Sequence, residues 1–367
     1  RQSSLPGLCP VAQAVEVLAT DAGIEARGAV FTRREIVEFL LDLCGYKADR
    51  PLHKLKLLEP SFGGGDFLLP AIKRLLAAWN TSDDPRMSVK ALAGAIRAVE
   101  LHRETFTQTR GQVIDLLSRS GFTASQSIAL ADAWLVNDDF LLADLPEPFD
   151  VVIGNPPYVR QERVPDVLLT EYRSRYTTIY DRADLYIPFI ERSLRSLTNG
   201  GVLGFICADR WMKNRYGGPL RNLVSEQFHL KVYVDMVDTP AFHSEVIAYP
   251  AITIISREGV GATRIAHRPS IDRATLTTLA GLLSAPTLPK DAGPVRELAR
   301  VTNGAEPWLL ESSDQMALIR RLEGAFPLLE EAGCKVGIGV ATGADKAFIG
   351  DFESLNVVNK YDAIVMN

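Results

Sequence analysis

Short apolar runs that alternate with longer amphipathic stretches indicate an α/β protein. The segment RREIVEFLLDLCG, residues 33–45, carries apolar residues at helical spacing; Thr32 is placed to cap this helix and Gly45 to end it. A weaker helical pattern covers residues 11–23. From residue 55 onward, apolar runs typical of buried strands alternate with helical segments.

Seven of these apolar runs are predicted strands. They cover residues 55–60, 94–100, 132–140, 149–155, 201–208, 230–238 and 249–258. Because helical segments separate most of them, right-handed crossover connections are expected between parallel neighbours. The predicted fold is a doubly wound, mostly parallel seven-stranded sheet with helices on both faces.

The same pattern divides the chain into four parts. We expect an N-terminal helical segment over residues 1–27 and the sheet domain over residues 28–257. A proline-containing linker and a helical segment follow over residues 258–330, and a further domain begins over residues 331–367. The chain starts without methionine and stops in mid-pattern, which indicates a piece of a longer protein.

Composition narrows the class of protein. The chain has 367 residues, of which 47% are hydrophobic, enough to bury a large core. It contains no run of about 18 uncharged apolar residues, so we expect no membrane partner and a cytoplasmic location by default. The formal net charge of -5 is not that of an electrostatic nucleic-acid binder. The four cysteines lack the spacing of a metal site, and no metal is predicted.

Glycine-rich sequence follows the first predicted strand. In a doubly wound sheet, ligands bind outside the carboxyl ends of the strands. Here Glu59, Pro60 and Ser61 precede a cluster in which Gly63 and Gly65 allow a tight turn and close approach of a ligand. The cluster has neither the lysine of a phosphate-binding loop nor the full spacing of a dinucleotide motif. Glu59 would oppose a phosphate but would hold a cationic amino group; alone, a plain turn explains the cluster equally well.

Three more strand ends carry polar or aromatic side chains. Glu100 follows the second strand, where an acid accepts hydrogen bonds from ribose hydroxyls in nucleoside-binding sheets. After the third strand, Asp139 can accept from an adenine amine and Phe140 can pack on a ring. Asn155 follows the fourth. Each residue alone is compatible with a structural role, but together they predict an adenine, a ribose and a cationic aminoacyl group, the shape of S-adenosylmethionine.

The ordered motifs resemble the amino-group DNA methyltransferases of the gamma arrangement. The resemblance rests on GAVFTRREIVEFLLDLCG, LLEPSFGGGDFL and NPPYVRQE, and is strongest to the branch in restriction-modification enzymes that includes single-chain Type IIG proteins. It implies the S-adenosylmethionine-dependent methyltransferase fold over residues 28–257, with Thr32 touching the methionine part of the cofactor. VGIGVATGADKAFIG resembles the start of a target-recognition domain, which places that domain in residues 331–367.

The Asn-Pro-Pro-Tyr motif carries the implied chemistry. By resemblance, the enzyme methylates the exocyclic amine of an adenine that is flipped out of double-stranded DNA. The side-chain oxygen of Asn155 and the carbonyl of Pro156 would accept the two amine hydrogens, and Pro156 and Pro157 would keep the turn rigid. Tyr158 is the first candidate to stack on the flipped base.

Several alternatives stay open. Phe242 is the second stacking candidate by resemblance, with a core position as its alternative and Tyr249 as the competing aromatic residue. A protein-glutamine or RNA methyltransferase would use the same acceptor geometry, and a scaffold without catalysis would be expected to lose the intact motif. Restriction and specificity parts are expected as fused or separate partners.

Overall fold

The computed structural model describes most of the first 310 residues. The described residues are 9–20, 30–81, 89–146, 148–243, 249–308 and 310, with a few positions between 318 and 333. The chain divides into two compact units, residues 1–310 and residues 311–367. Of the predicted target-recognition segment 331–367, only residues 331–333 are described, as a turn, and the rest lies outside the described residues.

A single sheet organises the first unit. Its strands, in spatial order, are β3 (Leu135–Asn137), β2 (Ile96–Glu100), β1 (Leu57–Glu59), β4 (Phe149–Gly154), β5 (Leu197–Ala208), β7 (Pro250–Ser256), β6 (His229–Asp235), β8 (Thr263–His267) and β9 (Arg296–Leu298). Strands β1 to β5 pair in parallel, as do β6 and β8, whereas β7 and β9 run antiparallel to their neighbours. The predicted α/β fold class with a mostly parallel sheet is confirmed.

All seven predicted strands are present, and the sheet has two more. Strand β3 is shorter than the predicted 132–140, because its first residues complete the preceding helix. Strands β8 and β9 lie in the segment 258–330 that was expected to be a linker and a helix. Both are short, and β8 forms by pairing with the edge of β6, a contact that local sequence does not specify.

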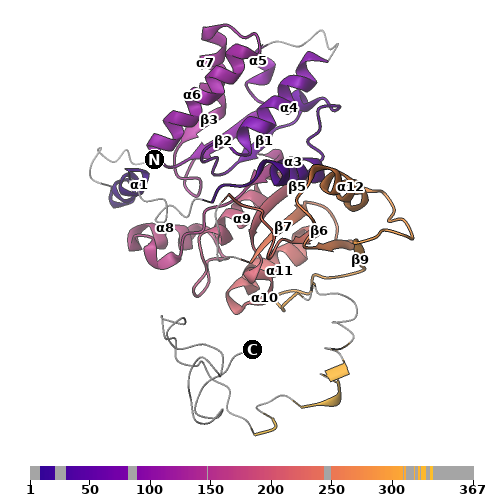
Figure 1. Cartoon of the computed structure of the whole chain (residues 1–367). Helices are drawn as coiled ribbons and strands as arrows, with labels where there is room; N and C mark the ends of the chain where they lie inside the picture. The colour runs from indigo at the N-terminus through magenta and orange to yellow at the C-terminus, as the bar shows by residue number, and fades with distance from the viewer. Residues whose placement is uncertain are drawn as a thin grey trace, which may run out of the picture. The chain divides into compact units, whose positions relative to one another are not determined.

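Helices cover both faces of the sheet (Figure 1). One face carries α3 (Arg34–Leu43), α4 (Leu68–Asn80), α5 (Val89–Leu92), α6 (Arg103–Arg119), α7 (Ala124–Trp134) and α12 (Arg273–Ser284). The other carries α1 (Pro10–Thr20), α8 (Asp166–Arg175), α9 (Tyr186–Arg195), α10 (Arg210–Lys213) and α11 (Gly218–Gln227). Short 3-10 helices are η1 (Leu52–Lys54), η2 (Gln161–Arg163) and η3 (Arg215–Gly217). No helix among the described residues is long and apolar enough to cross a membrane.

Strand side chains alternate between two hydrophobic cores. Leu57 and Ile153 belong to the core beneath α3 and α4, whereas Leu58 and Val152 belong to the core beneath α9 and α11. This alternation follows from the two-residue period of a strand and explains why the central strands are apolar throughout. Helix α3 approaches β5 closely at Gly204, where a Cβ atom would lie 2.9 Å from the Leu40 side chain.

The strand order reverses between β1 and β4. From β1 the chain proceeds outward to β2 and β3, and it then returns to place β4 on the other side of β1. In open α/β sheets such a reversal leaves a crevice at the carboxyl ends of the two strands. The loops that follow Glu59 and Gly154 therefore face each other across this crevice.

Candidate functional site

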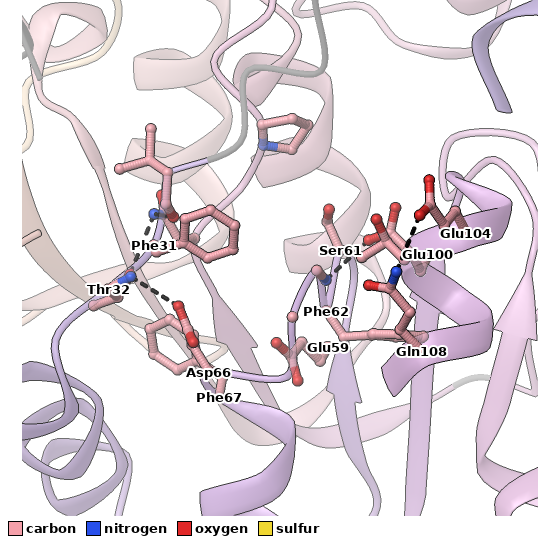
Figure 2. A pocket seen from close by; sticks show the side chains of 16 residues that line it. Phe31, Thr32, Glu59, Ser61, Phe62, Asp66, Phe67, Glu100, Glu104 and Gln108 are labelled. Carbon is pink, nitrogen blue, oxygen red and sulfur yellow. Dashed lines mark hydrogen bonds between the residues drawn. The ribbon is translucent and has the colours of Figure 1, made fainter. Parts of the chain in front are cut away.

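Two adjoining cavities lie at the carboxyl ends of β1, β2 and β4. The first has a volume of about 310 Å³ and is lined by the segment 30–32, by the turn after β1 and by the first turns of α6 (Figure 2), and also by Asn155 and Pro157 after β4. The second, of about 100 Å³, extends toward the end of β3. Both share Ser61, Glu100 and Pro157, so they form one continuous site.

Most residues predicted to bind the cofactor line these cavities. Those lining the first are Thr32, Glu59, Ser61, Gly63 and Glu100. Those lining the second are Pro60, Ser61, Glu100, Asp139 and Phe140. Gly65 lines neither; its φ of +87° and its close packing on Thr109 shape the turn instead.

The glycine turn is fixed by Glu100 and by helix α6. The backbone N–H of Gly63 donates to Oε2 of Glu100 at 2.9 Å, and the Gly63 carbonyl accepts from Oγ1 of Thr109 at 2.8 Å. Oε1 of Glu100 accepts from the backbone N–H of His102 at 2.8 Å. Glu100 thus holds the turn as well as lining both cavities.

Glu59 is a buried carboxyl group with an unused acceptor. Its exposure is 1%, and among the described residues its Oε2 has no hydrogen-bond partner. Burial raises its pKa well above the ordinary value, and the nearby carboxylates of Asp66 and Glu100 raise it further. A buried carboxyl group without a cation is costly, and a cationic ligand group in the first cavity would relieve that cost.

The Asn155 side chain is held in one orientation. Its Nδ2 donates to the Val30 carbonyl at 3.0 Å and to Oγ1 of Thr32 at 3.3 Å. Because a carbonyl oxygen only accepts, the amide nitrogen must face Val30. Oδ1 is therefore on the other side of the amide, buried and without a partner among the described residues.

Thr32 does not cap helix α3, contrary to the sequence prediction. The N-cap residue is Arg33, and its side chain makes no capping hydrogen bond. The Thr32 hydroxyl faces Asn155 instead, and its backbone pairs with Phe242 in an isolated antiparallel bridge. Thr32 is thus held between the Asn-Pro-Pro-Tyr motif and a distant segment of the chain.

The other residues of the Asn-Pro-Pro-Tyr motif differ in whether they line the cavities. Pro157 lines both cavities, and Pro156 is buried. Tyr158 lines neither cavity: its ring centroid is 6.5 Å from that of Tyr186, and its hydroxyl is buried, which raises its pKa. The stacking role of Tyr158 stays a prediction.

At the second cavity, Asp139 and Phe140 already have protein partners. The Asp139 carboxylate accepts from the Tyr172 hydroxyl and from the backbone N–H of Leu141 at 2.8 Å. The Phe140 ring lies 5.0 Å from the Phe189 ring, and the Arg192 guanidinium lies 4.8 Å from the Phe140 centroid. Their predicted contacts with an adenine stay predictions.

Of the two competing aromatic residues, Phe242 is the buried one. It is 8% exposed, packs in the core beneath α3, and lines neither cavity. Tyr249 is 50% exposed, and the Arg210 guanidinium lies 4.9 Å from its ring centroid. This burial favours the core alternative for Phe242, whose stacking role stays a prediction.

Several residues that line the first cavity were not predicted from the sequence. These are Phe31, Asp66, Glu104, Thr105 and Gln108. Glu104, Thr105 and Gln108 share one face of α6 directly after Glu100, a spacing that could have indicated them. Phe31 and Asp66 gave no such signal, because their place depends on the approach of segment 30–32. Among the described residues, no cluster of metal-ligating side chains occurs.

Comparison with known proteins finds methyltransferases of restriction-modification systems among the relatives of this chain. Residues 86–242 match the Eco57I restriction-modification methylase family. The chain is 76% identical over 350 residues to the Type II methyltransferase M.PaeR7I of Pseudomonas aeruginosa, covering 95% of this chain and 61% of that protein. It is 53% identical over 338 residues to the Type II methyltransferase M.XhoI of Xanthomonas vasicola, covering 91% and 62%. The chain thus spans about three fifths of the length of these curated relatives.

A solved structure shares the fold. The M protein of the Type I restriction enzyme EcoKI aligns with a TM-score of 0.53 at 13% identity, covering 83% of this chain and 73% of that one. At this identity the likeness shows the fold alone, and it confirms the methyltransferase fold predicted from the sequence. The family match and the two Type II relatives add the kind of protein to this fold. The chain is similar to the Eco57I restriction-modification methylase family over residues 86–242, and to these two Type II methyltransferases over nearly its whole length.

Proposed function

We propose that this protein transfers a methyl group from S-adenosylmethionine to the exocyclic amine of adenine in double-stranded DNA. The family match and the Type II relatives support methyl transfer to DNA in a restriction-modification system. One observation carries the choice of an amine as acceptor: Asn155 presents a buried, unpartnered Oδ1 while its Nδ2 is held by two protein acceptors.

The residues of the two cavities fit S-adenosylmethionine. Glu59 has a buried, unused carboxylate oxygen for the amino group, and Thr32 lines the same cavity. Glu100 would receive the ribose hydroxyls, and the second cavity would receive the adenine. When bound, S-adenosylmethionine supplies an electrophilic methyl group on a sulfonium.

Asn155 would make the substrate amine nucleophilic. The lone pair of an adenine amine is delocalised into the ring, so the amine attacks poorly until that pair is localised. Oδ1 of Asn155 and the Pro156 carbonyl would each accept one amine hydrogen, which favours a pyramidal nitrogen and stabilises the positive charge that develops on it. Because Val30 and Thr32 already hold the Asn155 amide, little reorganisation is required during transfer.

The target base must leave the DNA stack to reach Asn155. Unstacking costs a few kcal/mol, and contact with aromatic rings offsets about 1 to 3 kcal/mol for each stacked base. Tyr158, Phe242 and the exposed Tyr249 are the candidate rings. Restriction and specificity parts, fused or separate, are the proposed partners.

The test is methylation of a defined DNA by the protein as its gene encodes it. Labelled S-adenosylmethionine is supplied, and the modified base is mapped. Label is expected on the adenine amine, and Asn155→Ala is expected to lower kcat by about 10²-fold or more, since it removes one fixed transition-state contact. Asn199→Ala is the matched control. This exposed asparagine lies near the start of β5, whereas the cavities lie at the carboxyl ends of the strands. Label on cytosine, or full activity of Asn155→Ala, would refute the proposal.

A further inference from the structure

Asp66 connects the turn after β1 to the segment that faces it across the first cavity. Its Oδ2 accepts from the backbone N–H of Thr32 at 2.9 Å, across 34 positions of sequence (Figure 2). Asp66 is half-buried and lines the cavity with Glu59. Its carboxylate therefore anchors Thr32 from the cavity side.

The anchored segment is the one that orients Asn155. The Val30 carbonyl and the Thr32 hydroxyl are the two acceptors of Nδ2 of Asn155. On its other side the segment pairs with residues 242 and 243: Thr32 forms the bridge to Phe242, and the Phe31 carbonyl accepts from the backbone N–H of His243 at 3.0 Å. The segment 30–32 is thus held from both sides, and the hydrogen bond to Asp66 is the one that holds it on the side of the cavity.

We propose that Asp66 is a positioning residue for methyl transfer, which holds Thr32 so that Val30 and Thr32 keep the Asn155 amide oxygen turned toward the substrate amine. The inference rests on the proposed function and deepens it. Asp66 acts through Thr32 and Asn155. Its carboxylate holds the backbone N–H of Thr32, and the Thr32 hydroxyl in turn holds the side-chain amide of Asn155. The role requires a hydrogen-bond acceptor at this position, and it does not require a negative charge.

The requirement for an acceptor makes the role testable by two substitutions. Asp66→Ala removes the acceptor, whereas Asp66→Asn keeps a side-chain oxygen that can accept from Thr32. In Asp66→Ala we expect kcat to fall about tenfold, because loosening a catalytic group costs rate through lost alignment, while the KM for S-adenosylmethionine changes less than about threefold. Asp66→Asn should recover kcat to within about threefold of the wild type.

A second readout does not depend on activity. In protein labelled with ¹⁵N-asparagine, the side-chain NH₂ signal of Asn155 is identified by its loss in Asn155→Asp. Without cofactor, this signal should shift and exchange faster with water in Asp66→Ala, and should stay near its wild-type position in Asp66→Asn. In a Thr32→Val background, Asp66→Ala should change kcat much less, because the link to Asn155 is already broken.

Asp272→Ala is the matched control for lost stability. Asp272 also accepts from a threonine backbone N–H at 2.9 Å, that of Thr275, at the start of α12. This variant should lose some thermal stability while its kcat and its Asn155 signal stay unchanged.

Three results would overturn the inference. These are unchanged kcat and Asn155 signal in Asp66→Ala, an equal loss in Asp66→Asn, and a loss confined to the KM for S-adenosylmethionine. Failure of the wild-type protein to methylate adenine would instead refute the proposed function. The NMR comparison would still decide whether Asp66 holds the Asn155 amide.

Discussion

The two cavities of the site differ in how their polar atoms are satisfied. In the first, Oε2 of Glu59 and Oδ1 of Asn155 are buried and have no partner among the described residues. In the second, the Asp139 carboxylate is already paired with Tyr172 and Leu141, and Phe140 is in contact with Phe189 and Arg192. The same kinds of residue follow each strand, yet one set is left available for a ligand and the other set stabilises the fold.

These two arrangements of polar atoms differ in their effect on the stability of the ligand-free protein. A buried polar atom without a partner costs about 1 to 3 kcal/mol, so the first cavity destabilises the ligand-free protein. The hydrogen bonds of Asp139 offset part of the cost of burying its carboxylate, whose pKa burial still raises. A ligand that satisfies Glu59 would recover the cost, whereas one that uses Asp139 must compete with Tyr172. Ligand affinity is therefore expected to depend on the first cavity more than on the second.

Removing the charge of Glu59 is expected to have the largest effect. Glu59→Gln should weaken the binding of S-adenosylmethionine about 10- to 100-fold, because it removes a buried, charge-assisted contact to the amino group. Isothermal titration calorimetry measures the change. Glu104→Gln is the control, since this carboxylate lines the same cavity but accepts from Gln108 within α6. Equal affinities of wild type and Glu59→Gln would remove the distinction between the cavities.

A substitution in the second cavity should change the stability of the protein more than its affinity for S-adenosylmethionine. Tyr172→Phe leaves one oxygen of buried Asp139 without its donor and should lower the free energy of unfolding by about 1 to 3 kcal/mol. The affinity for S-adenosylmethionine should change less than about threefold, because Asp139 gains a free acceptor. Urea unfolding and calorimetry give the two values. Tyr233→Phe is the reference, as it removes a comparable buried bond, to Asp209. A loss of affinity greater than tenfold would show that the Asp139–Tyr172 pair belongs to the binding surface.

The sequence was informative where a residue's position follows from its own strand. The apolar runs that become β1 and β4 end in Glu59 and in Asn155, and the crevice between two such strands follows from the α/β pattern. The sequence could not show that Tyr172 satisfies Asp139, because that contact depends on where α8 packs, 33 residues away. For the same reason it gave Thr32 a capping role and overlooked Asp66. Residue type was predictable from local pattern, whereas the partner of each side chain was decided by tertiary contacts.

The smallest expected effect is on the free energy of unfolding of the ligand-free protein. Glu59→Gln should raise it, whereas Tyr172→Phe should lower it. Burial, with Asp66 and Glu100 nearby, raises the pKa of Glu59 in the folded protein above its value in the unfolded chain. The stability that the protonated form contributes is therefore complete below the unfolded pKa and is lost as the pH rises through the folded pKa. Glu59→Gln stays neutral throughout, so its unfolding free energy should fall less between pH 5 and pH 8.

At pH 7.5, Glu59→Gln should accordingly be more stable than the wild type by on the order of 1 kcal/mol, even though it should bind S-adenosylmethionine more weakly. Urea unfolding at several pH values, without cofactor, measures the difference. Parallel pH curves for the two proteins would mean that Glu59 is satisfied before any ligand arrives. In that case both cavities would be alike in the free protein, and the weaker binding of the variant would reflect only the lost charge of Glu59, with no contribution from relief of an unpaired carboxyl group.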